Sequence, residues 1–69
     1  MADLNEQAAL AAEILGGLAL EGHHIVATAE SLTGGAVAAA ITSVPGASQW
    51  FDRGFVVYTP RAKSEMLDV

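Results

Sequence analysis

The 69-residue sequence contains no cysteine, few basic side chains and no long hydrophobic run. Without cysteine there can be no disulfide, no thiolate metal ligand and no cysteine nucleophile. Three basic against eight acidic side chains give a formal net charge of −5, which leaves no phosphate-neutralising surface for nucleic acid. The apolar stretches fall far short of the roughly 20 residues that span a bilayer, and the N-terminus is acidic where a signal peptide is basic. We therefore expect a soluble, cytoplasmic protein that binds neither nucleic acid nor membranes.

Large apolar side chains are also few. Hydrophobic residues make up 52% of the sequence, but 14 of them are alanine, which leaves 22 larger side chains for a core. Compact domains cluster at about 100–150 residues, and shorter chains bury a smaller fraction of their surface. We therefore expect one small unit whose open sheet edge and apolar faces are covered by more chain or by partner subunits.

The pattern of the residues that are present predicts an α/β protein. Apolar side chains at helical spacing predict a helix over 4–20, opened by a capping box of Asp3 and Glu6, and they recur along one face at Leu4, Ala8, Ala11, Leu15 and Leu18. Gly22 is the expected stop of this helix. Unbroken β-favouring runs then predict buried parallel strands over 23–29 and 55–58.

A helix is predicted after each strand. The first runs from the Gly35 region to about Ser43, and a short helical turn follows over 47–52. The second covers 61–67, with Thr59 as its N-cap and Pro60 as its first residue. Two successive strand–helix units imply the beginning of a three-layer α/β/α fold with a parallel sheet.

Both strand-to-helix turns open on the edge of the sheet where ligands bind in parallel α/β folds. In the first turn, Ser31 and Thr33 supply hydroxyls, while Gly34 and Gly35 let backbone N–H groups approach an anion at the positive end of the helix. Such residues are equally ordinary in helix capping, and the Gly-Lys-Ser/Thr ending of a P-loop is missing. Capping and anion binding therefore both remain open for this turn.

The second turn places Lys63 near the start of a helix. The helix dipole disfavours a cation there, which favours the neutral amine that a general base requires. Most lone lysines are nevertheless solvated surface charges. A catalytic and a surface role therefore both remain open for Lys63.

Other polar and aromatic residues are expected to be structural. Glu30 is a default hydrogen-bond acceptor, with a second general base as the alternative. His23 and His24 are adjacent, so on a strand they would point to opposite faces and could not share a metal; we expect no metal and no cofactor. The aromatic side chains of Trp50, Phe51 and Phe55 are expected in the core or a subunit interface. Arg53 is expected to have a structural or interface role.

Three blocks in the same order resemble the CinA C-terminal domain family, which includes nicotinamide mononucleotide amidases. They are TAESLTGG at 28–35, VPGASQWFDRGFVVY at 44–58 and AKSEML at 62–67. The first block departs from its commonest form at Leu32, where cysteine is usual. That cysteine is not the family's nucleophile, so the departure leaves the expected chemistry intact.

The resemblance implies a hydrolase of pyridine nucleotide salvage that converts nicotinamide mononucleotide to nicotinate mononucleotide and ammonia. It implies Ser31 as nucleophile, Lys63 as base, Tyr58 near the substrate and the turn of Thr33, Gly34 and Gly35 at the site. It also implies that residues 1–69 are the N-terminal half of the amidase domain, with no second domain, and that the protein is a homo-oligomer. The alternatives are a non-catalytic nucleotide-binding or assembly module and an inactive fragment of the amidase.

Overall fold

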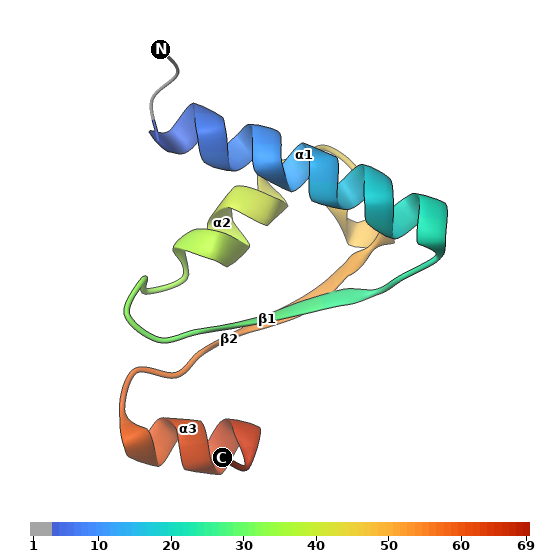
Figure 1. The fold of residues 1–69 in the computed structure, drawn as a ribbon. Helices are drawn as coiled ribbons and strands as arrows, with labels where there is room; N and C mark the ends of the chain where they lie inside the picture. Colours follow the sequence, from blue (N-terminus) through green and yellow to red (C-terminus); the bar gives the residue numbers. More distant parts are fainter. Residues whose placement is uncertain (1–3) are drawn as a thin grey trace.

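The structure is a computed structural model that describes residues 4–69. Its elements in chain order are α1 (Leu4–Gly22), β1 (Val26–Glu30), α2 (Ala36–Thr42), the 3₁₀ helix η1 (Ala47–Gln49), β2 (Phe51–Val56) and α3 (Pro60–Leu67). The strands β1 and β2 form a parallel two-stranded sheet. Helices α1 and α2 lie on one side of the sheet and α3 lies on the other (Figure 1). The predicted α/β class, parallel sheet and layer order are therefore confirmed.

Helix α1 packs through a face of small residues. Ala12 and Ala19 are buried, and Gly16 between them faces Trp50, which is only 2% exposed. A Cβ atom on Gly16 would lie 2.8 Å from the Trp50 ring, so only glycine permits this approach. The face that the apolar spacing singled out is not the buried one, since Leu18 is 62% exposed.

The C-terminus of α1 is closed by a backbone cap. The helix ends at Gly22 as predicted, but His23 takes the left-handed conformation, with φ of 57°. The His24 N–H donates to the Ala19 carbonyl at 2.8 Å and the His23 N–H donates to the Leu20 carbonyl at 3.2 Å, the bonding pattern of a Schellman motif. Both histidines therefore lie in this cap and not on β1 as predicted, because the cap consumes the residues before the strand.

Strand β2 begins four residues earlier than its apolar run indicated. Val26 pairs with Phe51 while Ala27 pairs with Arg53, so the register shifts at the start of the sheet and Asp52 is skipped. Asp52 and Arg53 form an exposed ion pair at 2.5 Å, which gives Arg53 an exposed partner rather than a buried structural role. These exposed polar residues hid the first half of the strand from sequence reasoning.

The core is small and centres on Trp50, as expected for the aromatic residues. The Phe51 ring packs edge-on to Trp50, with centroids 6.4 Å apart and planes at 67°. The other members of the core cluster are Ala12, Ala19, Ile41 and Ala47. Large apolar side chains remain exposed on α1, α2, β2 and α3 and just before β1, as expected from the thin core; they include Leu10, Ile14, Leu18, Ile25, Val37, Val56 and Met66.

Two further predictions from the sequence concern the start of the chain and its environment. Asp3 of the predicted capping box lies outside the described residues. Across residues 4–69, none of the helices combines the length and apolarity needed to cross a membrane.

Candidate functional site

The two strand-to-helix turns lie at one edge of the sheet. Strands β1 and β2 run in the same direction, so the turn after β1 and the turn after β2 open at the same end (Figure 1). The Val57 N–H donates to the Glu30 carbonyl at 2.8 Å, and this hydrogen bond joins the two segments where the strands end. Ser31 follows Glu30 directly, and Lys63 lies in α3 just after the second turn. Residues 32 positions apart in sequence are thereby brought to one edge.

The Ser31 and Lys63 side chains are both partly buried at this edge. Within residues 4–69 they do not hydrogen-bond to each other or to a third side chain. Tyr58, the expected substrate neighbour, is 66% exposed in the second turn. Ser31, Tyr58 and Lys63 therefore lie at one edge of the sheet, with no hydrogen bond between Ser31 and Lys63 in the described chain.

Glu30 organises the first turn. Its side chain is buried and accepts three hydrogen bonds: from the Thr33 hydroxyl at 2.6 Å, from the Val37 N–H at 2.7 Å and from the Ala38 N–H at 2.9 Å. The bond from Thr33 is the main cause of a lowered pKa at Glu30; burial opposes it, and the two N–H groups lower the pKa further. The structural acceptor expected from the sequence is confirmed.

This arrangement changes the expected anion site. Val37 and Ala38 are the second and third residues of α2, so Glu30 occupies the N–H groups that a helix N-terminus would otherwise offer to a ligand. The N–H groups of 32–35, in contrast, make no hydrogen bond within the described part of the chain. Donors for an oxyanion are therefore found in the turn itself and not at the end of the helix.

Two glycines give the first turn its shape. Gly34 has φ of 65° and Gly35 has φ of 103°, both in the left-handed region that side chains disfavour. A Cβ atom on Gly35 would also contact Val56 at 3.5 Å. The two glycines thus let the chain reverse tightly between β1 and α2 and keep the backbone of the turn accessible.

The second turn is built by ordinary helix capping. The Thr59 hydroxyl accepts from the Ala62 N–H at 3.0 Å, and Pro60 is the first residue of α3, both as predicted. Arg61 pairs with Glu65 at 2.7 Å on the exposed side of this helix. Since Arg53 is also paired, Lys63 is the one basic side chain of the described chain that has no carboxylate partner.

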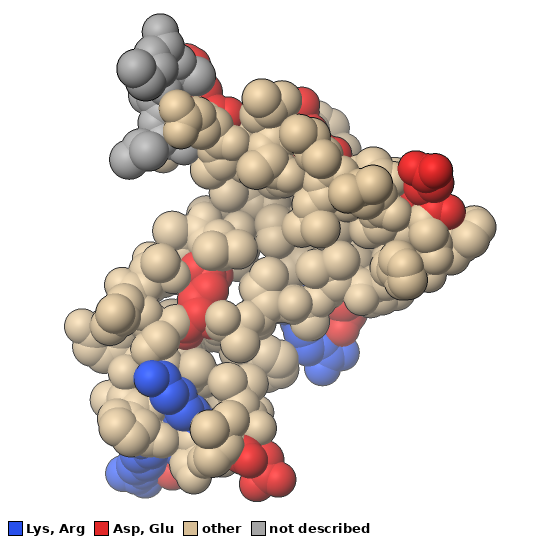
Figure 2. All heavy atoms as spheres, in the orientation of Figure 1, with Lys and Arg blue, Asp and Glu red and all other residues tan. Residues whose placement is uncertain are grey.

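Charge is distributed unevenly around the site. Figure 2 shows acidic side chains over α1 and also over the sheet and α3, whereas the basic side chains lie only over the sheet and α3. The basic residues on those elements are Arg53, Arg61 and Lys63. Because Arg53 and Arg61 pair with Asp52 and Glu65, Lys63 is the positive charge on the α3 side that no carboxylate neutralises.

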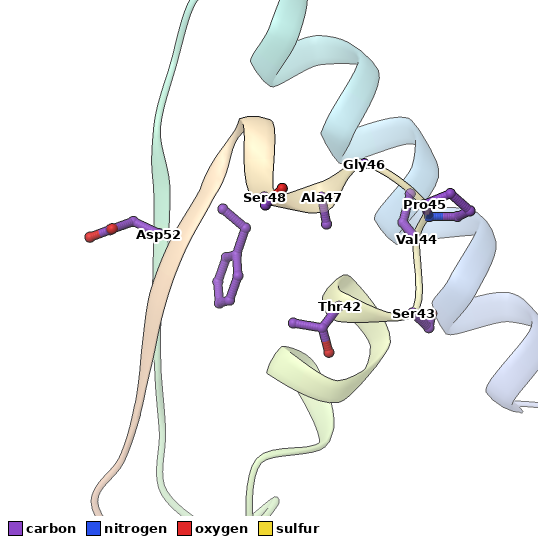
Figure 3. A pocket seen from close by; sticks show the side chains of 9 residues that line it. Thr42, Ser43, Val44, Pro45, Gly46, Ala47, Ser48 and Asp52 are labelled. Atoms are coloured by element: carbon purple, nitrogen blue, oxygen red, sulfur yellow. The ribbon is translucent and has the colours of Figure 1, made fainter.

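The best-formed hollows lie elsewhere. One, of about 530 Å³, is lined by residues 42–48 with Phe51 and Asp52, at the opposite end of the sheet. In Figure 3 the Asp52 side chain points away from the others that line it. Two further hollows, of about 330 Å³ and 480 Å³, lie between α1 and α2. None of these three hollows is lined by Ser31, Tyr58 or Lys63.

No metal centre is evident in the part of the chain that the structure describes, because no three histidine or acidic side chains gather there.

Sequence reasoning named candidate site residues but not the hydrogen-bond partners of Glu30. A glutamate directly after a buried strand was the available signal. Its donors on α2 could not be identified, since they lie seven and eight residues further along the chain.

The chain is similar to curated bacterial proteins. It is 59% identical over 44 residues to nicotinamide-nucleotide amidohydrolase PncC of Enterobacter agglomerans, and that match covers 64% of this chain and 27% of the relative. It is 47% identical over 57 residues to a CinA-like protein of Chlorobium phaeobacteroides, covering 83% of this chain and 14% of the relative. The matched part therefore spans about a quarter or less of these relatives.

Solved structures share the fold. A competence-damaged protein (CinA) superfamily protein of Escherichia coli superimposes with a TM-score of 0.88 at 29% identity, covering 100% of this chain and 40% of that one. A competence/damage inducible protein of Agrobacterium tumefaciens gives 0.72 at 42% identity, covering 100% and 39%. A family model described as the CinA C-terminal domain matches residues 7–69. The chain belongs to the CinA C-terminal domain family.

Proposed function

We propose that this chain supplies the nucleophile and the base of a nicotinamide-nucleotide amidase. The observation that carries the proposal is the parallel pairing of β1 and β2, which puts Ser31, directly after β1, and Lys63, in the helix after β2, at the same edge of the sheet. Similarity to proteins named nicotinamide-nucleotide amidohydrolase supports the choice of substrate. Lys63 has no carboxylate partner within the described residues, so no ion pair holds its amine away from a substrate at this edge.

The proposed reaction needs no histidine. The Ser31 Oγ attacks the carboxamide carbon of nicotinamide mononucleotide, and the Lys63 Nζ accepts the hydroxyl proton and passes it to the leaving ammonia. Water then hydrolyses the acyl-enzyme to nicotinate mononucleotide and restores the serine. The free N–H groups of 32–35 would hold the oxyanion that forms in each step.

The substrate-binding roles proposed for the turn are limited by its hydrogen bonds. The Thr33 hydroxyl donates a hydrogen bond to Glu30. Towards a substrate, Thr33 therefore offers only the acceptor lone pairs of this hydroxyl and its backbone N–H. Gly34 and Gly35 offer backbone alone. Tyr58 offers an exposed ring and hydroxyl at the same edge, suited to contact with the pyridine ring or the ribose.

Ammonia release from nicotinamide mononucleotide tests the proposal. It should be measured for this chain and for a chain extended to the length of the relatives, each with Ser31→Ala and with Ser43→Ala as the matched control. Ser43 is exposed, and its hydroxyl donates to the Ala40 carbonyl of the preceding helix at 2.6 Å. We expect Ser31→Ala to reduce turnover by about 10³-fold or more and Ser43→Ala to leave it unchanged. Turnover near the parent level in Ser31→Ala would reject the nucleophile.

A non-catalytic nucleotide-binding or assembly module, or an inactive fragment, is the second candidate. It is favoured by the small share of the relatives that the chain covers and by hollows that leave Ser31 outside. Calorimetry with nicotinamide mononucleotide separates the cases. Binding without ammonia release in both chain lengths would support the module, and neither binding nor release in the short chain alone would support the fragment.

We also propose that the chain associates with copies of itself. Leu10, Ile14 and Leu18 form an exposed stripe on α1, at 58%, 59% and 62% exposure, and such surfaces favour association. Sedimentation at micromolar concentration, read beside a thermal melt, provides the test. A monodisperse monomer with a cooperative transition that is independent of concentration would contradict it.

A further inference from the structure

The Glu30 carboxylate connects the first turn to α2 through hydrogen bonds. It directly precedes Ser31 and is only 6% exposed. Burial of an ionised carboxylate is costly unless donors replace the lost water, and here three donors do so at 2.6 to 2.9 Å. The chain therefore commits a buried charge to one location beside the proposed nucleophile.

The donors come from the first turn and from the helix that follows it. Thr33 lies in the middle of the turn, while Val37 and Ala38 belong to α2. The main-chain carbonyl of Glu30 in addition accepts from the Val57 N–H of the second turn. One residue thus connects the nucleophile's turn with the helix after it and with the chain segment that leads to Lys63.

A direct role in proton transfer does not fit this geometry. Both carboxylate oxygens face donors from the turn and from α2, and Glu30 forms no hydrogen bond with Ser31 in the described chain. Donors that favour the ionised form also make it a weak base. Its contacts are those of a side chain that acts through its neighbours.

We propose that Glu30 is a positioning residue for the amidase reaction: it fixes the turn that carries Ser31, and it fills the positive end of α2 so that the oxyanion is directed to the N–H groups of 32–35. The inference rests on the proposed function. It deepens that proposal by naming the residue that orients the nucleophile.

Glu30→Gln is the test variant, because it preserves shape and replaces one acceptor oxygen with an NH₂ group that cannot accept. Glu13→Gln, on the exposed side of α1, is the matched control. Amide hydrogen exchange followed by NMR should be about tenfold or more faster at Val37 or Ala38 in Glu30→Gln, the loss expected for a charge-assisted hydrogen bond. Exchange at Val57, which bonds to the Glu30 main chain, should stay within about twofold of the parent.

Kinetics in the active chain form the second arm. We expect Glu30→Gln to lower kcat about tenfold or more with KM within a few-fold of the parent, and to leave the shape of the pH profile unchanged. Loss of a limb of that profile would mean that Glu30 is a general base and would overturn the positioning role. Unchanged exchange together with unchanged kcat would overturn it as well.

Thr33→Val keeps the test decisive if Glu30→Gln fails to fold. It removes only the hydroxyl donor, so we expect a smaller loss of kcat in the same direction, about three- to tenfold, with retained secondary structure. No loss of kcat in Thr33→Val would then reject the proposal. If neither chain length of the parent releases ammonia, the proposed function fails and the positioning role fails with it, whereas exchange alone still decides whether Glu30 holds the turn.

Discussion

The two strand-to-helix turns at the site are built in different ways. The first, between β1 and α2, is tied by a buried carboxylate with three hydrogen bonds and by two left-handed glycines. The second, between β2 and α3, has one exposed cap at Thr59 and leads into a helix without a buried residue. The nucleophile and the base of the proposed reaction therefore stand on supports of unequal strength.

This difference shows which part of the site the chain determines by itself. Segments with few buried apolar contacts open locally at low free-energy cost, whereas hydrogen-bonded buried segments open only with the core. The geometry around Ser31 is accordingly fixed within this chain. Fixed geometry around Lys63 requires further cover for α3, by additional chain or by another subunit.

The largest expected effect comes from the chemistry of the second turn. Lys63→Arg places a permanent positive charge at the edge and cannot lose a proton, so the base is removed while a cationic side chain is kept. We expect turnover to fall by about 10²- to 10⁴-fold, the usual contribution of general acid–base catalysis. Arg61→Lys, two residues earlier on the exposed side, is the control and should stay near the parent level. Substantial activity in Lys63→Arg would show that the charge matters rather than proton transfer.

Acid should affect the first turn more than the second. The pKa of Glu30 in the folded chain lies below its ordinary value of 4.5, so its contribution to stability is complete above that value and is lost as the pH falls through the lower folded pKa. Urea unfolding followed from neutral to acidic pH should show a steeper loss of stability below about pH 4.5 in the parent than in Glu30→Gln. Glu13→Gln should retain the steep loss, and equal slopes in all three would contradict the assignment.

A moderate effect is expected at the cap of α3. Thr59→Ala removes the acceptor for the Ala62 N–H and should cost about 1 kcal/mol of helix stability. Thr42→Ala, whose hydroxyl bonds to carbonyls of its own helix, is the matched control and should cost less than about 0.5 kcal/mol. Amide exchange in α3 and in α2 measures the two changes; loss of protection in α2 on substituting Thr59 would show that the turns are coupled.

The smallest effect is expected at the ion pair on α3. Arg61 and Glu65 are exposed and spaced i, i+4, a pair that contributes about 0.3–0.5 kcal/mol. Arg61→Ala should therefore lower the stability of α3 by no more than this amount, and added salt should reduce the difference further. A loss comparable to that of Thr59→Ala would mean that the second turn depends on its surface charges.

The sequence was sufficient for the element order and for the N-cap of α3, because these depend on local residue chemistry. Thr59 and Pro60 define the start of α3 in the structure as they do in the sequence. The inward face of α1 could not be predicted: Gly16 is there to admit the Trp50 ring, and closeness of packing is a property of two distant segments. The early start of β2 was also missed. Asp52 and Arg53 are charged and exposed in the two-stranded sheet, so they lack the apolar pattern by which a buried strand is predicted.

The sequence predicted the edge at which the candidate residues lie but not the contacts that support them. Strand–turn–helix order alone placed Ser31 and Lys63 at one edge. The network around Glu30 depends on how α2 packs back on the turn, which no local pattern encodes. The assignment of catalytic roles to Ser31, Lys63 and Tyr58 stays a prediction.

A double-substitution cycle tests the central claim most directly. Ammonia release should be measured for the parent, Ser31→Ala, Lys63→Met and the double variant in the same chain. Residues that act as one catalytic unit are not additive, so we predict that the double variant loses no more activity than the more damaged single variant. Losses that multiply in the double variant would contradict the account, because they would show that Ser31 and Lys63 contribute independently.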